Sequence, residues 1–396
     1  MFDKRTVKDV DVAGKRVLVR VDFNVPLTGA GAVADDMRIR ATLPTLRYLV
    51  DHDAKVIVVS HLGRPKGEPD PAFSLHPVVH VLSKLLGRNV HFIGEVVGPD
   101  VTDAVSRMVP GEILMLENVR FEPGEKTNDP AFARQLADLA DIYVDDAFGA
   151  AHRAHASTVG VAADLPAYAG LLLAKEVDTL TDLLTAPAHP FAAVLGGSKV
   201  SYKLALVERF LGIVDTILIG GGMCFTFLVA KGVPVGRSLV EADFVEEAKR
   251  VLELARTKGV DIVLPVDFVV AASIAEDAAT KVVGREEIPA DMMGLDIGPT
   301  TVELFKHAVA DAKTIFWNGP MGVFELTPFE AGTRAVASAI AANLRAVSVV
   351  GGGDSDAALK KFGLEERMTF VSTGGGASMK LLEGAKLPGV EALQDK

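Results

Sequence analysis

Three consecutive glycines and an acidic residue follow a short apolar run late in the chain. Residues 347–350 are typical of a buried parallel strand. Glycines 351–353 and Asp354 follow it, just before a helix expected over 356–362. Glycine inside regular structure destabilises it by about 0.5–1 kcal/mol, so three together indicate backbone that passes close to a ligand. Amides at a helix start bind anions, and Asp354 can hold the metal that accompanies nucleotide phosphates. The alternative is a plain glycine-rich turn.

Two lysines follow another strand that ends in glycines. Residues 191–195 predict a strand, Gly196-Gly197-Ser198-Lys199 follow it, and a helix is expected directly afterwards with Lys199 and Lys203 on one face. A cation in the first turn of a helix is disfavoured by about 0.3–1 kcal/mol, and a bound polyanion would offset this cost. The pair therefore indicates a phosphate site, with two solvated surface lysines as the alternative.

Polar and basic residues stand just past strand ends in the first half of the chain. Asp22 and Asn24 follow a strand over 16–21 that Pro26 must end, because proline cannot donate to a ladder. Planar guanidinium groups suit phosphate and carboxylate oxygens. One arginine alone is more often a solvated surface residue, whereas several at one edge of an acidic protein predict an anion site. The remaining members of this group are Arg38, His61, Arg64, Arg120, His152 and Arg153.

Strands and helices alternate between these residues. Strands are predicted at 16–21, 55–60, 90–93, 113–116 and 141–144, with helices at 37–49, 77–86 and 131–140. This alternation implies a parallel, doubly wound sheet, whose ligands lie outside the carboxyl ends of the strands.

The second half repeats the design with glycines in place of charged residues. Strands are predicted at 191–195, 216–219, 262–264, 314–317, 347–350 and 369–372, and five of them end in glycine clusters. The Walker pattern G-x-x-x-x-G-K-[ST] does not occur. We therefore expect a nucleotide site built from several loops on a second parallel sheet.

Length and composition limit the class of protein. A chain of 396 residues is too long for one ordinary core and suggests two domains. The net charge of −11 argues against a general nucleic-acid or membrane-surface binder, and the single Cys224 excludes an internal disulfide. The first residues lack an apolar signal core, and no run approaches the ~20 apolar residues that span a bilayer. We expect a cytoplasmic protein with no nucleic-acid or membrane partner.

One motif supports a different function. Residues 29–34 match the dinucleotide pattern G-x-G-x-x-G/A, which keeps a dinucleotide-dependent dehydrogenase as an alternative. Pro26 and the acidic pair Asp35-Asp36 do not fit the strand, turn and helix that this motif requires. We therefore expect a hairpin or loop there.

The sequence blocks, taken in order, resemble the phosphoglycerate kinase family over essentially the whole chain. They are VDFNVP, SHLGRP, ENVRF, DAFG with AHRAH, GGSKVSYK, GGGM, GLDIGP, FWNGPMGVFE, GGGDS and STGGGAS. The resemblance implies reversible transfer of the acyl phosphate of 1,3-bisphosphoglycerate to Mg²⁺-bound ADP, which gives 3-phosphoglycerate and ATP in glycolysis. A non-catalytic nucleotide-binding protein of the same fold is a further alternative, which predicts the loss of a phosphate-handling group.

The resemblance also implies an architecture and a set of site residues. The fold class is α/β, with two doubly wound (Rossmann-like) parallel-sheet domains over 1–169 and 187–379, a hinge helix over 170–186, and a tail over 380–396 that returns to the first domain. The helix alone is equally consistent with an ordinary crossover. A hinge-bending monomer is expected. The acid substrate is expected on Asp22, Asn24, Arg38, His61, Arg64, Arg120, His152 and Arg153. The nucleotide is expected on Lys203, Gly294, Asn318, Glu325, Gly352, Gly353, Asp354 and Ser355, with Asp354 as the ligand of Mg²⁺. Arg38, Lys199, Gly374, Gly375 and Gly376 would surround the phosphoryl group during transfer.

Three positions depart from the family pattern. Met379-Lys380 stands where Leu-Glu is common, which adds a positive charge behind the transfer site. Asp145 stands where Asn is common and adds a negative charge near the anion site, and Ser355 stands where Thr is common. None removes a group that the proposed chemistry needs.

Overall fold

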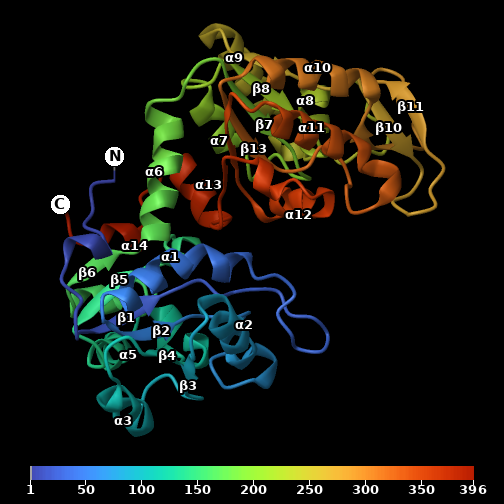
Figure 1. The fold of residues 1–396 in the computed structure, drawn as a ribbon. Helices are drawn as coiled ribbons and strands as arrows, with labels where there is room; N and C mark the ends of the chain where they lie inside the picture. Colours follow the sequence, from blue (N-terminus) through green and yellow to red (C-terminus); the bar gives the residue numbers. More distant parts are fainter. Residues whose placement is uncertain (1) are drawn as a thin grey trace. The chain divides into compact units, whose positions relative to one another are not determined.

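The computed structural model describes residues 2–396, and the chain divides into two compact units. The N-terminal unit comprises Met1–Thr181 with Ala385–Lys396, and the C-terminal unit comprises Asp182–Gly384. Each unit is built around its own six-stranded sheet with helices packed against it (Figure 1). No helix within residues 2–396 is long and apolar enough to cross a membrane.

The sheet of the N-terminal unit is parallel throughout, in the order β3-β4-β2-β1-β5-β6. Its branched apolar strands are buried on both faces, as expected for a parallel sheet covered by helices. The strands are β1 (Arg16–Arg20), β2 (Lys55–Val59), β3 (His91–Phe92), β4 (Ile113–Met115), β5 (Ile142–Asp145) and β6 (Ala167–Ala169). The helices are α1 (Met37–Asp51), α2 (His76–Leu86), α3 (Pro99–Arg107), α4 (Gly124–Thr127), α5 (Pro130–Ala137) and α14 (Pro388–Glu391).

The main sheet of the C-terminal unit is also parallel, in the order β15-β14-β13-β7-β8-β9. Its core includes Trp317 and Phe316, which are fully buried. The strands are β7 (Phe191–Leu195), β8 (Thr216–Ile219), β9 (Asp261–Val263), β13 (Thr314–Asn318), β14 (Val347–Val350) and β15 (Phe370–Val371). The helices are α7 (Leu204–Phe210), α8 (Met223–Ala230), α9 (Val245–Lys258), α10 (Pro299–Asp311), α11 (Ala331–Ala342), α12 (Gly353–Phe362) and α13 (Gly376–Leu382). Helix α6 (Leu171–Thr185) runs across the boundary between the two units.

Two parallel α/β sheets confirm the predicted fold class, and the predicted strands lie within a residue or two of those observed. The pattern missed β6 and a second, antiparallel sheet in the C-terminal unit, in the order β11-β10-β12. That sheet comprises β10 (Asp267–Ala271), β11 (Lys281–Gly284) and β12 (Met293–Ile297). The dinucleotide-like motif is a loop closed by a bridge between Leu27 and Val33, as predicted.

Two helix predictions are wrong at their starts. The helix after Lys199 begins only at Leu204, so Lys199 lies in a turn rather than in a first helical turn. The helix predicted from residue 356 begins at Gly353, which places Asp354 in its first turn. Helix propensity is a weak guide to such boundaries, because tertiary contacts override it.

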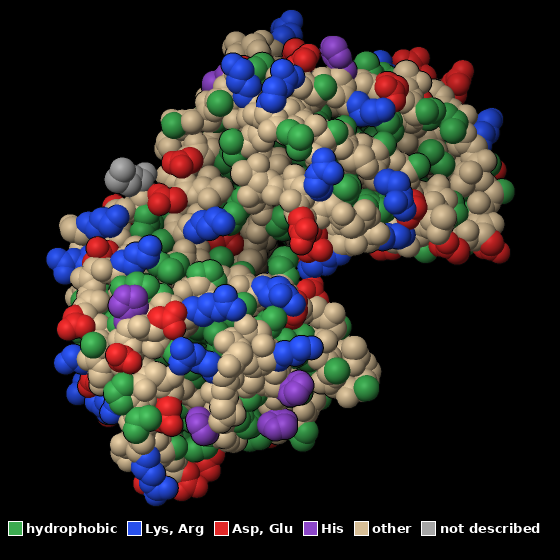
Figure 2. Space-filling view, in the orientation of Figure 1, with side chains coloured by type: hydrophobic (Ala, Val, Ile, Leu, Met, Phe, Trp, Pro, Cys, Tyr) green, Lys and Arg blue, Asp and Glu red, His purple; other side chains and the backbone are tan. Residues whose placement is uncertain are grey.

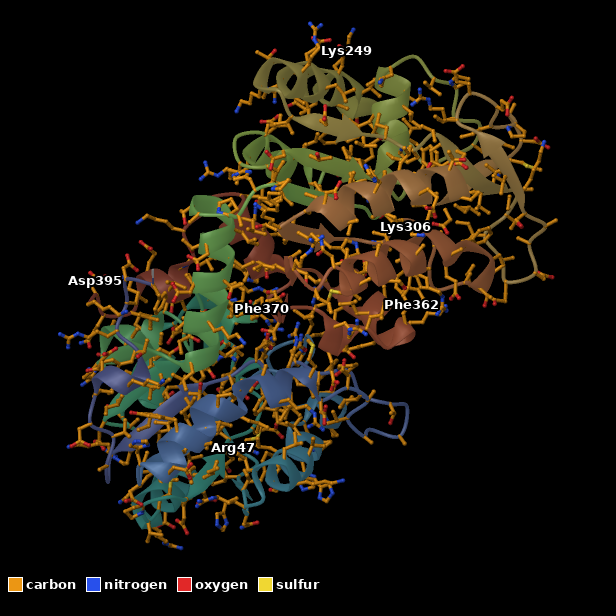
Figure 3. The ribbon with its side chains drawn as sticks, turned by 45° about the horizontal axis from the view of Figure 1, so that its top comes forward. Arg47, Lys249, Lys306, Phe362, Phe370 and Asp395 are labelled. Carbon is orange, nitrogen blue, oxygen red and sulfur yellow. The ribbon has the colours of Figure 1, made fainter. Side chains whose placement is uncertain are left out.

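The C-terminal tail belongs to the N-terminal unit. The Arg5 amide donates to the Gln394 carbonyl over 2.8 Å, and the Lys396 amide donates to the Asp3 carbonyl over 2.9 Å. The Lys4 ammonium donates to Oδ1 of Asp395 over 2.6 Å. Asp395 is labelled in Figure 3. These contacts join the two ends of the chain.

Candidate active site

Asp22 and Arg38 form the first pair of the site in the N-terminal unit. Asp22 lies two residues past the end of β1, and Arg38 lies in the first turn of α1. The Nη1 atom of Arg38 donates to Oδ2 of Asp22 over 2.7 Å, and Nδ1 of His61 lies 3.7 Å from Oδ1 of Asp22. The side-chain oxygen of Asn24 accepts from the Gly63 amide over 2.8 Å. The carboxyl ends of β1 and β2 are therefore joined by the residues predicted to bind the acid.

Arg120 and Arg153 add two further guanidinium groups. Arg120 follows β4 and donates from Nη1 to the Gly63 carbonyl over 2.5 Å. Burial, and then the nearby charge of Arg153, lowers the pKa of Arg120 to about 10. Nε of Arg153 donates to Nε2 of His152 over 3.1 Å, and burial lowers the pKa of His152. The pKa of Arg120 is thus lowered mainly by burial, and the neighbouring arginine charges act in the same direction.

His61 reports how closely the arginines converge. It is 4% exposed, and burial lowers its pKa well below the usual value, followed by the charges of Arg20, Arg120, Arg38 and Arg153. A neutral imidazole among four guanidinium groups makes a strongly positive site that favours an anion. On the face seen in Figure 2, basic and acidic side chains are interspersed, with no broad basic patch. The positive charge around His61 comes from the four arginines named above.

Arg20 was not predicted as part of the site. It is 1% exposed, and its Nη2 lies 3.0 Å from Nδ1 of His61. A guanidinium group can only donate, so Nδ1 accepts and the ring proton of neutral His61 is on Nε2. Nε of Arg20 donates to Oγ of Ser157 over 2.8 Å, and that hydroxyl donates to Glu125 over 2.7 Å. An arginine inside the strand RVLVRV was the available signal, because arginine is almost never buried without partners.

The remaining acidic and basic predictions near this site have mixed outcomes. Arg64 is exposed, and its place in the site stays a prediction. Asp145 is buried, and burial raises its pKa to about 7, so the negative charge expected there is only partial at neutral pH. Asp146 is also buried, and its Oδ1 accepts from the amides of Leu172 and Leu173 at the start of α6.

The C-terminal unit contains two cavities at the carboxyl edge of its parallel sheet. The first, named here the apolar cavity, has a volume of about 470 Å³ and is lined by Phe225, Leu239 and Phe268. Of the predicted nucleotide residues it includes Gly294 and Glu325. Its apolar walls suit the flat face of a nucleotide base. Phe225 lies in α8, Phe268 in β10 and Leu239 in a loop, and none of them was predicted from the sequence.

The second, named here the glycine cavity, has a volume of about 570 Å³ and borders the glycine-ended strands. Asp354 lines both cavities. The two sites therefore meet at the residue predicted to hold the metal. The other predicted residues that line the glycine cavity are Lys203, Asn318, Gly352, Gly353, Ser355, Gly375 and Gly376.

Several predicted residues brace the glycine loops. The Lys203 ammonium donates to the carbonyls of Gly196 over 2.5 Å and Asn318 over 2.7 Å. Burial lowers the pKa of Lys203 to about 7, although Asp354 acts in the opposite direction. The amide nitrogen of the Asn318 side chain donates to the Gly351 carbonyl over 2.7 Å. These contacts fix the backbone around the space that phosphate would enter.

The glycines serve two different purposes. Gly319 has a φ of 95°, and a Cβ there would meet the Gly196 carbonyl oxygen and lie 2.5 Å from Nζ of Lys203. Its amide donates to Oγ of Ser355 over 2.6 Å. Gly353, in contrast, faces open space. The first glycine allows loops to pack together, and the second leaves the cavity free of a side chain.

The residues predicted to meet the transferring group are only partly brought together. Gly375 and Gly376 line the glycine cavity, and the Gly374 amide donates to Oγ of Ser372 over 3.2 Å. Lys199 is exposed, with its ammonium 5.7 Å from the centroid of the Tyr202 ring. Tyr202 lines the glycine cavity, whereas Lys199 itself does not, so its catalytic role stays a prediction.

The donor set at Asp354 fits a magnesium ion that arrives with a nucleotide. Within residues 2–396 no group of three or more His, Cys, Asp or Glu side chains could hold a metal by itself. Mg²⁺ is usually held by one or two carboxylates together with phosphate oxygens and water. The exposed Asp354, placed between the two cavities, matches that arrangement.

Comparisons with known proteins identify the family to which the chain belongs. The family profile described as "Phosphoglycerate kinase" matches residues 7–385. A protein named "Phosphoglycerate kinase" from Rubrobacter xylanophilus is 56% identical over 395 residues, covering 100% of this chain and 99% of its own length. The structure of phosphoglycerate kinase from Coxiella burnetii has a TM-score of 0.88 at 42% identity and covers 98% of both chains. That from Pyrococcus horikoshii has a TM-score of 0.86 at 34% identity.

Proposed function

The chain belongs to the phosphoglycerate kinase family, and from this premise we propose how its two units divide the reaction. The enzyme is a phosphotransferase with a carboxyl group as acceptor. It transfers the acyl phosphate of 1,3-bisphosphoglycerate to ADP, reversibly and in line, and gives 3-phosphoglycerate and ATP in glycolysis. The observation that carries the division is that an apolar cavity and a glycine-lined cavity share Asp354 in one unit, while the arginines converge in the other.

The N-terminal unit binds the acid substrate in this proposal. Its phosphate and carboxylate are held by the guanidinium groups of Arg38, Arg64, Arg120 and Arg153, whose planar donors match oxyanions. Asp22 orients Arg38 through their 2.7 Å hydrogen bond, and Asn24 fixes the loop at Gly63. His61 offers a neutral N–H from Nε2, and His152 supports Arg153.

The C-terminal unit binds the nucleotide. The base enters the apolar cavity beside Gly294, and Glu325 lies at the same cavity. The phosphates enter the glycine cavity, which Lys203, Asn318 and Ser355 shape and where Gly352 and Gly353 leave room. When bound with the nucleotide, Mg²⁺ would be held by Asp354 and would neutralise phosphate charge.

Catalysis then rests on position and charge. The attacking group in the ATP-consuming direction is a carboxylate, which is already ionised at pH 7, so no general base is needed. Arg38, Lys199 and the amides at Gly374, Gly375 and Gly376 stabilise the charge on the transferring group. Because the two substrates belong to different units, we infer that the units close on each other and exclude water from the acyl phosphate.

Several finer expectations belong to this proposal. The enzyme acts as a cytoplasmic monomer, and its only substrates are small molecules. The boundaries 1–169, 170–186 and 187–379 describe the lobes and hinge. The tail over 380–396 supports the N-terminal lobe.

A coupled assay of ATP formation from 1,3-bisphosphoglycerate and ADP tests the function directly. We expect turnover that depends on Mg²⁺ and is abolished by a chelator. Absence of turnover would contradict the proposal. Tight binding of NAD without affinity for ADP would favour a dehydrogenase, and ADP binding without turnover would favour a non-catalytic protein of this fold.

A further inference from the structure

The segment that carries both lysines is not held by a helix. Residues 198–203, named here the lysine turn, lie in the connection between β7 and α7, and α7 begins only at Leu204. Lys199 and Lys203 lie at or near the two ends of this turn. Helical hydrogen bonds therefore do not fix the position of Lys199, and another contact must do so.

Glu241 makes that contact. Its Oε2 accepts from the Ser201 amide over 2.9 Å, and its Oε1 accepts from the Ser201 hydroxyl over 2.7 Å. The carboxylate of Glu241 thus binds both the backbone and the side chain of Ser201, in the middle of the lysine turn. Burial raises the pKa of Glu241, but the hydrogen bonds from Ser201 and Val200 and the charge of Lys199 together hold it below the usual value. Glu241 is therefore ionised at neutral pH, when its hydrogen bonds are strongest.

The backbone of Glu241 is bound to a buried residue of the core. The Glu241 amide donates to Oγ1 of Thr226 over 3.1 Å, and Thr226 is 1% exposed in α8. Two residues earlier in the chain, Leu239 lines the apolar cavity, as does Arg237. The segment 237–241 therefore extends from the wall of the apolar cavity to the lysine turn, within one unit.

We propose that Glu241 is a positioning residue for phosphoryl transfer, because it holds the lysine turn so that Lys199 reaches the transferring group. Segment 237–241 connects this arrangement to the cavity proposed for the base. The inference rests on the proposed function, and specifically on Lys199 as a transfer residue. A displacement of about 1 Å at such a group can lower the rate about a hundredfold.

Steady-state kinetics of Glu241→Ala and Glu241→Gln test the inference, in the wild-type background and in Lys199→Ala. In the wild-type background we expect Glu241→Ala to lower kcat by at least about tenfold with KM for ADP changed by less than about threefold. Glu241→Gln keeps an acceptor for the Ser201 amide, so its loss should be smaller. In the Lys199→Ala background, Glu241→Ala should cause no further loss, since both changes remove the same contribution.

Glu247→Ala provides the matched control. Glu247 lies in α9 of the same unit, and its carboxylate pairs with the exposed Arg250. Its removal should leave kcat and KM unchanged. Thermal unfolding of each variant shows whether the fold is intact, and Glu241→Gln serves as the test if Glu241→Ala does not fold.

The outcomes separate the inference from the function on which it rests. Near-normal turnover of Lys199→Ala would remove Lys199 from the transfer step and so overturn the premise of the inference, whereas the proposed function would stand. A large loss in Lys199→Ala with normal turnover in both Glu241 variants would overturn the inference alone. An equal loss from Glu241→Ala in both backgrounds would also overturn it, because that result describes a general structural role.

Discussion

The two parallel sheets of this protein carry different kinds of residues at their carboxyl edges. Both have six strands with the first strand of the unit in the middle of the order. The carboxyl edge in the N-terminal unit carries guanidinium groups held by buried partners, whereas that in the C-terminal unit is dominated by glycines and open space. One edge is prepared by side-chain charge and the other by the shape of the backbone.

The difference follows from what each edge has to do. Like charges repel one another, so clustered arginines need acidic partners. Asp22 pairs with Arg38, and the buried Glu125 is linked to Arg20 through Ser157. The C-terminal edge has few fixed charges because a nucleotide brings its own Mg²⁺. We therefore expect activity to be lost when a side chain is deleted from the edge in the N-terminal unit and when one is added to the edge in the C-terminal unit.

Arg38→Ala should cause the largest effect. It removes a guanidinium group proposed to stabilise the transferring charge and leaves Asp22 without its partner, so kcat should fall by about 10²–10³-fold. Steady-state kinetics with saturating substrates measure this change. Arg40→Ala is the matched control, because Arg40 lies on the same helix and pairs with Asp36 at the surface. A loss below tenfold would show that the charge of this edge is shared too widely for one arginine to matter.

Gly319→Ala should damage the other edge through the fold. The new Cβ would require a strained φ and would meet the Gly196 carbonyl, which we expect to lower the free energy of unfolding by about 1–3 kcal/mol. Gly353→Ala is the contrasting variant, since nothing lies near its Cβ. It should change stability by less than about 0.5 kcal/mol and raise KM for ADP. Denaturant unfolding and steady-state kinetics of both variants measure these effects. Normal binding of ADP by Gly353→Ala would contradict the idea that the C-terminal edge depends on space left free by glycine.

Lys203 should couple nucleotide binding to proton uptake. Its pKa is about 7 in the folded protein and near 10.5 in the unfolded chain. The unfolded chain therefore binds an extra proton between about pH 7 and 10.5, and this lysine makes the free protein more stable as the pH rises across that window. Bound phosphate should raise the pKa again. At pH 8, binding should take up about 0.9 proton, and at pH 6 about 0.1.

Calorimetry of ADP binding in buffers of different ionisation enthalpy measures this uptake. The variant Lys203→Met should abolish it. Uptake that is the same at pH 6 and pH 8 would contradict the lowered pKa. The N-terminal edge should behave differently, because the guanidinium groups of its arginines stay charged throughout this range.

The sequence predicted both sheets because glycine and proline mark strand ends locally. Strands β8 and β14 have the predicted bounds, and the residues that follow strands supplied most of the predicted site. What the sequence did not reveal depends on contacts between residues far apart. Arg20 reaches Ser157, which is 137 residues away, and Glu241 reaches Ser201 over 40 residues. A local pattern carries no record of such a pairing.

The same limit explains the wrong helix start at Lys199. Helical spacing was present at Val200, Leu204 and Val207, but Ser201 is bound by Glu241 in a turn. Serine side chains compete with helices by bonding elsewhere, and a carboxylate partner strengthens that competition. The antiparallel sheet was missed because β11 is short and half exposed, so its apolar pattern is weak.

Lys380→Glu should produce the smallest effect. Lys380 lines the glycine cavity, and its ammonium pairs with Glu383 over 2.8 Å with 58% of the lysine side chain exposed. Exposed pairs contribute only about 0.2–1 kcal/mol, so KM for ADP should rise by no more than about fivefold. Because salt screens exposed charges, the increase should disappear at about 1 M salt. A rise above tenfold that persists in high salt would place Lys380 in direct contact with the nucleotide, and the C-terminal edge would then depend on side-chain charge as the N-terminal edge does.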